Sequence, residues 1–365
     1  MSRSAQQRIL QARWASSDRF RDDVTQEELD AAVQDGVVDP MPIHGNKQTM
    51  NMNELLVHNI LGQAGDYFKR LLRLDTLRAL VDEIRENITH VEPFAGGTAR
   101  VPSSAFQMVF RLGVFTLSRK QMHSLLKDKT SPYVPAIGYL LLRYTAPPKD
   151  LWRWCARHIE DETPFRDSAD PSAPETTLGE WVRRLLTELN YFSTILPRIP
   201  VPVQRDIKAR LRVMEEAKAR GEANEDFVAS LTPGMRVKSL YSDDMKWYAA
   251  TVTAAADESG RVWVKYDAYG NEEGRAAGYL QPLRDDDDGA DDDEYGRYLK
   301  EVTTEEATRS QATGTDYAAR PTTYKSNLSL KMDSYTARGR KPAPSHTAAR
   351  GGAGAGAGGG GGAGG

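Results

Sequence analysis

Residues 131–154 constrain the fold more than any other stretch, because they encode two helix starts separated by a double proline. Ser131 can cap a helix that begins at Pro132, where the missing amide hydrogen of proline costs nothing. Apolar residues at helical spacing mark one face of this helix, namely Val134, Ile137, Leu141 and Leu142. Pro147 and Pro148 end the helix, and Pro148 can open the next one. We therefore expect a fixed corner in an all-helical core.

Further helical patterns lie on both sides of this corner. One stripe consists of Met52, Leu55, Leu56 and Ile60. Ser118 and Gln121 have the spacing of a capping box, and Thr177 and Glu180 fit a second one. The second box opens a stripe that we expect to continue as one helix up to Pro197, through Leu178, Val182, Leu185, Leu189, Phe192 and Leu196. Residues 25–34 could form one short amphipathic helix within an otherwise loose amino-terminal segment.

A basic amphipathic helix is expected after Pro202. Its apolar side carries Val203, Ile207, Leu211 and Met214. Its charged sides carry Arg205, Lys208, Arg210 and Arg212. The favoured interpretation is that the apolar stripe packs on the helical core and the charges are solvated, and contact with RNA is the alternative. The same choice applies to three tryptophans that could stack on bases but fit a core at helical spacing, Trp152, Trp154 and Trp181.

The pattern changes from helical to strand-like between Pro233 and Leu283. Residues 235–240, 247–253 and 261–266 read as short strands, and turn-forming residues separate them. About 50 residues of short strands favour a small five-stranded barrel, since closure removes exposed edges.

Composition limits the classes of function. The formal net charge is only −3, so charge-driven binding must be local. Cys155 is the only cysteine, which excludes an internal disulfide and a cysteine-based zinc site and suits a reducing compartment. The start of the chain has no apolar segment typical of a secretory signal. The Gly96-Gly97-Thr98 turn lacks the lysine of a phosphate-binding loop, and the histidines have no metal spacing. We expect no enzyme and no cofactor.

Seven blocks between residues 42 and 210 resemble, in family order, the pre-mRNA-splicing factor 38 family, B type. They are 49–53, 67–69, 89–93, 105–106, 115–121, 131–154 and 192–204. The resemblance implies a non-catalytic helical scaffold in the nucleus. It also implies docking onto spliceosomal proteins during activation, when the tri-snRNP joins pre-mRNA.

Residues 234–273 resemble a Tudor domain like that of the survival-of-motor-neuron protein. The matching pieces are Gly234, Tyr241-Ser-Asp-Asp, Trp247-Tyr-Ala-Ala-Thr-Val252 and Tyr266-Asp-Ala-Tyr-Gly-Asn-Glu-Glu273. The resemblance implies a methylarginine-binding cage of Tyr241, Tyr248, Tyr266, Tyr269 and Asn271. Aromatic faces attract a weakly hydrated cation, and methylation keeps the charge of arginine while it adds apolar surface. On this interpretation Tyr266→Ala removes a wall of the cage and leaves the barrel folded. The alternative is that the tyrosines only fill the barrel.

The expected organisation has five parts. They are a flexible arm (1–41), a helical domain (42–215), a helical linker (216–230), a Tudor-like domain (231–284), and an acidic linker followed by a disordered tail (285–365). The expected role is a spliceosomal scaffold that also reads dimethylarginine in Arg-Gly tails. The alternatives are a methylarginine adaptor outside splicing and a direct RNA-binding protein.

Overall fold

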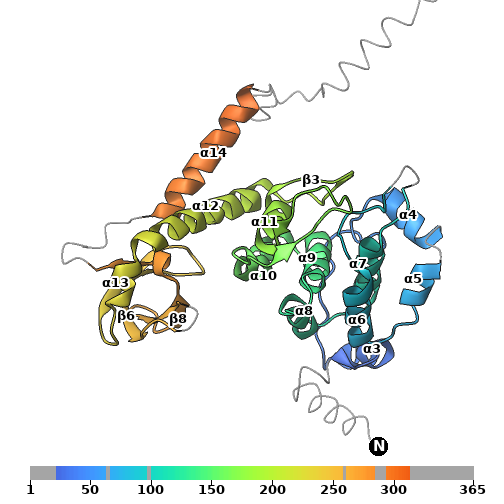
Figure 1. The fold of residues 1–365 in the computed structure, drawn as a ribbon, viewed down its shortest axis with the longest axis horizontal. Helices are drawn as coiled ribbons and strands as arrows, with labels where there is room; N and C mark the ends of the chain where they lie inside the picture. Colours follow the sequence, from blue (N-terminus) through green and yellow to red (C-terminus); the bar gives the residue numbers. More distant parts are fainter. Residues whose placement is uncertain (1–21, 63–65, 97–99, 258–259, 284–292, 313–365) are drawn as a thin grey trace, which may run out of the picture. The chain divides into compact units, whose positions relative to one another are not determined.

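Helices come first along the chain and a five-stranded sheet follows them (Figure 1). The computed structural model describes residues 22–62, 66–96, 100–257, 260–283 and 293–312. The helices before the sheet are α3 (Gln26–Gln34), α4 (Glu54–Gly62), α5 (Asp66–Leu71), α6 (Leu77–Asn87), α7 (Ser104–Val114), α8 (Arg119–Leu126), α9 (Tyr133–Thr145), α10 (Leu151–Cys155), α11 (Leu178–Thr187), α12 (Val201–Ala223) and α13 (Glu225–Ala229). The 3-10 turns η1 (Pro148–Asp150) and η2 (Ala156–His158) flank α10. The helical half of the predicted fold class is confirmed.

Helix α9 is the centre of the helical region. Every residue from Val134 to Thr145 is buried, and α6, α7, α8, α10 and α11 all pack against it. The helix ends at Thr145, and Pro148 opens η1, so the predicted corner is confirmed. A capping box of Ser118 and Gln121 starts α8 as predicted. Trp154 and Trp181 are buried and Trp152 packs against the core, which agrees with their core interpretation.

The helix that was expected to reach Pro197 is shorter than predicted. Helix α11 ends at Thr187, and the chain then forms a hairpin of β3 (Asn190–Tyr191) and β4 (Thr194–Ile195). Thr177 caps α11 by accepting from the Glu180 amide. Because Phe192 has a positive φ of 48°, the backbone turns there and the apolar period is not helical. A second small hairpin joins β1 (Pro164–Phe165) to β2 (Thr176–Thr177).

Two buried arginines tie helices together through backbone carbonyls. Arg143 is buried and donates from Nε to the Leu185 carbonyl at 2.8 Å. Burial lowers the pKa of Arg143 to about 10. Arg111 donates to the carbonyls of Leu71 and Leu74, at 3.1 and 2.7 Å. These carbonyls lie at or beyond the end of α5, where the helix leaves acceptors without partners.

The amino-terminal segment was expected to be a loose arm up to residue 41 with one short helix at residues 25–34. The helix is confirmed as α3, whereas the loose arm is wrong for residues 22–41. A capping box at Thr25 starts α3, and Leu29 is completely buried. The segment is held to the rest of the helical core by backbone hydrogen bonds, from Gln26 to Asp75 and from Met41 to Leu117. Residues 1–21 lie outside the described residues.

The sheet contains five antiparallel strands in the order β8-β7-β6-β5-β9. They are β5 (Arg236–Leu240), β6 (Trp247–Ala254), β7 (Val262–Tyr266), β8 (Glu272–Arg275) and β9 (Leu280–Pro282). One face covers a small apolar core that includes Val237, Val252, Val264 and Leu280. Among the described residues β8 and β9 are unpaired edges, so the sheet is open and the predicted closed barrel is not confirmed.

The predicted linker is helical and packs closely on the sheet region. Helix α12 runs without a break to Ala223, and the 3-10 helix η3 (Ala277–Tyr279) lies against it. A Cβ on Gly278 would lie 1.6 Å from the Ala217 carbonyl oxygen, so only glycine allows this contact. Ile207, Leu211 and Met214 are buried, as predicted for the basic helix. The domain limits at 215, 230 and 284 remain predictions.

The region after residue 285 was expected to be unstructured, and this is wrong for residues 294–312. They form helix α14 (Glu294–Ala312), in which Glu294, Tyr298 and Val302 are buried. Glu294 forms an ion pair with Arg220 at 3.2 Å and accepts from Trp247 Nε1 at 3.1 Å. Burial raises the pKa of Glu294 to about 7. Residues 313–365, the rest of the predicted tail, lie outside the described residues.

Candidate functional site

The five residues of the expected cage meet at one end of the sheet. Tyr241 follows β5 and Tyr248 lies in β6, whereas Tyr266 ends β7 and the other two lie in the turn before β8. Because the strands are antiparallel, the loops after β5 and β7 leave the sheet at the same end. The turn is closed by a hydrogen bond from the Gly270 amide to the Tyr266 carbonyl, and Gly270 has φ +70°. This left-handed conformation favours glycine.

The four tyrosine rings form one cluster. The Tyr241 and Tyr269 rings are nearly parallel, with an interplanar angle of 18°. Tyr248 stands at 85° to Tyr269, with ring centroids 5.3 Å apart. Tyr266 stands at 74° to Tyr241, with centroids 4.9 Å apart. A planar cation could bind between two such parallel rings and contact the perpendicular rings beside them through cation–π interactions.

Tyr266 is the floor of this cluster and belongs to the sheet core. It is fully buried, and its hydroxyl lies 3.1 Å from Ser239 Oγ and donates to the Leu240 carbonyl at 3.1 Å. Burial raises the pKa of the phenol. Tyr269, in contrast, is 55% exposed. The alternative that the tyrosines only fill the core therefore fits Tyr266 and does not fit Tyr269.

The parallel walls are closer than a bound guanidinium allows. A flat group between two rings needs about 7 Å, because each carbon contact has its optimum near about 3.5 Å. The Tyr241 and Tyr269 centroids are 5.9 Å apart. Tyr241 is held by Asn271, whose Nδ2 donates to the Tyr241 hydroxyl at 2.9 Å. When a guanidinium binds, we therefore expect the exposed Tyr269 ring to move away from Tyr241 by about 1 Å.

Two carboxylates beside the rings were not singled out from the sequence. Asp244 accepts from the Tyr248 hydroxyl at 2.6 Å, and this bond raises the pKa of Tyr248. Glu273 accepts from Ser242 Oγ at 2.6 Å, and its Oε2 lies 3.2 Å from the Tyr266 hydroxyl, whose one proton faces both this carboxylate and the Leu240 carbonyl. Both residues lie in the segments that carry the Tudor resemblance. Their closeness in sequence to the cage tyrosines could therefore have identified them as candidate site residues. They place negative charge around the rings and add to the attraction of a cation.

We expect Asn271→Ala to weaken binding of a dimethylarginine peptide by about threefold to tenfold, because a single hydrogen bond contributes about 0.5–1.5 kcal/mol. The aromatic walls remain, so binding should persist at higher peptide concentration. Isothermal titration of the full chain checks this. The matched control is Asn87→Ala, which removes an exposed amide far along the chain in α6. An unchanged affinity for Asn271→Ala would remove Asn271 from the site.

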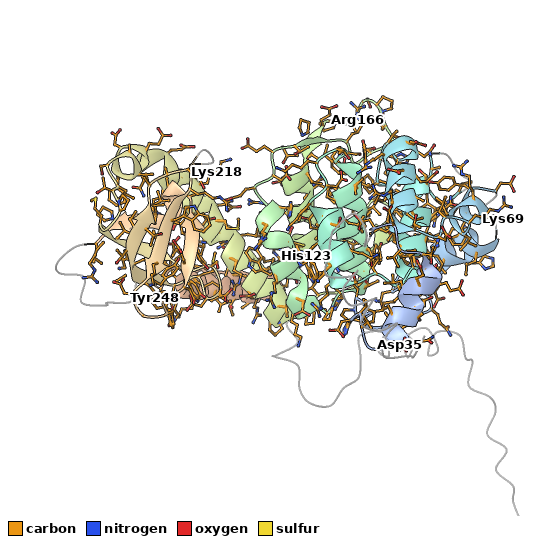
Figure 2. The ribbon with its side chains drawn as sticks, turned by 90° about the horizontal axis from the view of Figure 1, so that it is seen from below. Asp35, Lys69, His123, Arg166, Lys218 and Tyr248 are labelled. Atoms are coloured by element: carbon orange, nitrogen blue, oxygen red, sulfur yellow. The ribbon has the colours of Figure 1, made fainter. Side chains whose placement is uncertain are left out.

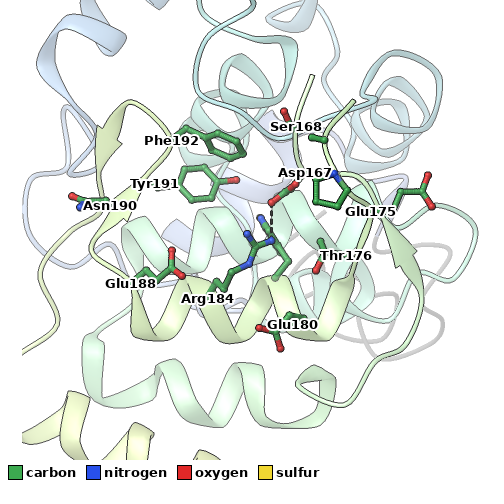
Figure 3. A pocket seen from close by; sticks show the side chains of 13 residues that line it. Asp167, Ser168, Glu175, Thr176, Glu180, Arg184, Glu188, Asn190, Tyr191 and Phe192 are labelled. Carbon is green, nitrogen blue, oxygen red and sulfur yellow. Dashed lines mark hydrogen bonds and ion pairs between the residues drawn. The ribbon is translucent and has the colours of Figure 1, made fainter. Parts of the chain in front are cut away.

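A separate cavity of about 610 Å³ lies beside α11 and the β3–β4 hairpin (Figure 3). Arg184 points toward Asp167 and forms an ion pair with it at 2.7 Å. The negative charge of the Asp167 carboxylate is therefore neutralised by the Arg184 guanidinium. Tyr191 and Phe192 form an aromatic wall, in which the rings stand at 89° to each other. This arrangement suggests no reaction chemistry.

No group of histidine, cysteine and acidic side chains in the described part of the chain could hold a metal ion. Burial raises the pKa of Cys155 to about 12, so the thiol stays protonated at neutral pH. None of the described helices combines the length and the apolarity that crossing a bilayer requires.

Comparison with known proteins shows that the helical region is similar to one known family. Residues 41–209 match the PRP38 family. The chain is 44% identical over 163 residues to "Pre-mRNA splicing factor SR-like 1" of Arabidopsis thaliana, covering 45% of this chain and 40% of that protein. It is 39% identical over 191 residues to "Pre-mRNA-splicing factor 38B" of Homo sapiens, covering 47% of this chain and 34% of that protein. The matches thus span less than half the length of these relatives.

Two solved structures show weaker likenesses. The first belongs to the Snu23-Prp38-MFAP1(217-258) complex of Chaetomium thermophilum, at 20% identity, a TM-score of 0.41, and coverage of 48% of this chain and 88% of that chain. The second is the extended Tudor domain TD3 from mouse TDRD1 in complex with a MILI peptide that contains dimethylarginine. It has 26% identity, a TM-score of 0.14, and coverage of 20% of this chain and 41% of that chain. At these TM-scores neither likeness carries an argument, and the predicted Tudor domain is not confirmed.

Proposed function

We propose that this protein is a non-catalytic pre-mRNA splicing factor that acts in the nucleus. The observation that carries the proposal is the PRP38 match over residues 41–209, together with relatives that are named as splicing factors. Helix α9 is buried along its length and five helices pack against it, so the helical region offers a rigid scaffold for docking. The partners are spliceosomal proteins, including components of the activation stage.

We propose further that the tyrosine cluster reads dimethylarginine in Arg-Gly segments. This rests on the two near-parallel rings, the perpendicular rings beside them, and the carboxylates of Asp244 and Glu273. Each cation–π contact contributes about 0.5–2 kcal/mol. After the cost of ordering a flexible peptide, the expected dissociation constant for one site is on the order of micromolar to millimolar. Several methylated sites on one partner would raise the affinity.

Direct RNA binding through the basic helix is the weaker candidate. Arg210 pairs with Asp206 at 2.9 Å and donates to the Asp243 carbonyl at 3.0 Å. Arg212 lies 3.5 Å from Glu301. These two guanidinium groups are therefore engaged within the chain, which reduces what remains for phosphate contact. Phosphate contact would produce a steep loss of affinity with salt, whereas binding in an aromatic cage would produce a shallow one.

Affinity purification of the tagged full chain from nuclear extract tests the splicing proposal. We expect splicing proteins to be enriched over the tag alone and to remain after RNase treatment, because the proposed contacts are between proteins. The control is Leu140→Asp, which places a charge at a fully buried position of α9 and should abolish recovery. Recovery of no splicing protein, or equal recovery with Leu140→Asp, would contradict the scaffold role.

A further inference from the structure

A groove of about 610 Å³ lies between α12, η3 and residues 159–162. Its floor is largely apolar and includes Ile159, Met214, Ala217 and Gly278. It is separate from the tyrosine cluster, because Tyr248 stands near the start of β6 and Gly260, which lines the groove, follows the end of that strand. Figure 2 shows Lys218, another groove residue, and Tyr248 on different sides of the part that carries the sheet.

The walls of this groove are strongly acidic. Seven carboxylate side chains line it against two cations, Arg183 and Lys218, so its formal charge is −5. Glu222 and Glu225 are exposed and have no ion-pair partner among the described residues. Glu162 has only Lys218 at 4.0 Å, and both side chains are largely exposed. Such a pair contributes little in water, so a stronger cation can displace it.

The groove is built before any ligand arrives. The contact of Gly278 with Ala217 fixes η3 on α12, and Arg220 Nε donates to the Gly278 carbonyl at 3.0 Å. Asn224 Nδ2 donates to the Leu280 carbonyl at 2.8 Å. From η3 the Tyr279 hydroxyl donates to Glu160 Oε1 at 3.3 Å, which joins η3 to residues 159–162. A preformed groove spares a ligand the cost of ordering the protein.

Charge and shape select the class of ligand. The carboxylates are spread along the walls, and no described set of them could hold a metal ion. Nucleic acid carries negative charge and would be repelled. The guanidinium of arginine is weakly hydrated, lies flat on apolar surface and pairs with carboxylates through two donors, which suits an apolar floor between acidic walls better than lysine does.

We propose that this groove binds an unmethylated, arginine-rich peptide segment of a partner protein. The site goes beyond the proposed reading of dimethylarginine and does not depend on it. A partner that carries both kinds of segment would engage the two sites together, and its affinity would exceed that for either site alone.

The test is fluorescence anisotropy of the full chain with a fluorescein-labelled peptide of six Arg-Gly repeats without methylation. The triple variant Glu162→Gln, Glu222→Gln, Glu225→Gln should weaken binding about tenfold, since each exposed charge pair contributes a few-fold. Lys218→Gln should strengthen binding about twofold to threefold, because it removes the competing cation. A gain of affinity is not a result that misfolding produces.

Two controls make the outcome specific. The triple variant Glu27→Gln, Glu54→Gln, Glu86→Gln removes the same charge from exposed positions on other helices and should change binding by less than about twofold. A Lys-Gly peptide of equal length should bind more weakly than the Arg-Gly peptide. Equal losses in both triple variants would mean that only net charge is sensed. A loss in Tyr269→Ala as large as in the groove triple would mean that the peptide occupies the tyrosine cluster. Either result overturns the proposal.

Discussion

A Tyr269→Ala variant of the full chain is expected to lose between about twofold and thirtyfold in affinity for a symmetrically dimethylated Arg-Gly peptide. The ring is one of the two near-parallel walls, and a cation–π contact contributes about 0.5–2 kcal/mol. Because the side chain is 55% exposed, its removal leaves no buried cavity, and the melting temperature should stay within about 2 °C of the parent value. Isothermal titration and a thermal melt measure the two quantities on one sample.

Tyr266→Ala is expected to lose binding for a different reason. This ring is completely buried, so its removal should cost about 3–5 kcal/mol and lower the melting temperature of the sheet region by roughly 10 °C. The expectation that Tyr266→Ala leaves the fold intact is therefore wrong on structural grounds. Tyr266→Phe is the matched control, because it keeps the ring and removes only the hydroxyl bonds. Identical melting curves for Tyr266→Ala and the parent would contradict the buried position of Tyr266. Unchanged peptide affinity in Tyr269→Ala would contradict the proposed binding site.

Truncation after residue 293 is expected to destabilise the protein, whereas truncation after residue 312 is not. The shorter chain lacks Tyr298 and Val302, which are buried, and the carboxylate of Glu294 that holds Arg220 and Trp247. Loss of this apolar burial costs about 3–6 kcal/mol, which corresponds to a drop in melting temperature on the order of 10 °C.

Differential scanning calorimetry of chains 1–293, 1–312 and 1–365 checks this result. The sequence predicts an acidic linker and a disordered tail over 285–365, because the acidic run and the glycine-rich end dominate the composition there, and such a tail would be dispensable for folding. Equal melting temperatures for 1–293 and 1–312 would restore that earlier expectation. Glu294→Gln should give a melting temperature between those of chains 1–293 and 1–312, since it keeps an acceptor for Trp247 and removes the charge that faces Arg220.

Local signals in the sequence predicted the helical region well. The caps at Ser118 and Thr177 and the break at Pro147 depend only on neighbouring residues, and the structure has them where they were expected. The predicted continuation of α11 to Pro197 is wrong. Leu189, Phe192 and Leu196 have the spacing of a helical apolar face, but they lie in and around the β3–β4 hairpin. A positive φ at Phe192 leaves no trace in a hydrophobic pattern.

The candidate site was predictable to a similar degree. The resemblance to a Tudor domain pointed to four tyrosines and Asn271, and the antiparallel sheet brings these residues together from the loops after β5 and β7 and from the strand ends beside them. Closure of the sheet depends on whether its two edges meet, which no local pattern specifies. The roles of Asp244 and Glu273 likewise depend on side-chain packing at the finished site.

The sequence by itself determined the order of a helical region and a strand region, the start of α8 and the end of α9. These features follow from caps, prolines, periodicity and turns, which act over a few residues. Only the tertiary structure decided that one face of α3 and one face of α14 are buried, that Tyr266 is a floor and Tyr269 a wall, and that an acidic groove forms against η3. Burial and charge clustering depend on segments that lie far apart in the chain, and the contact between them exists only once the chain has folded.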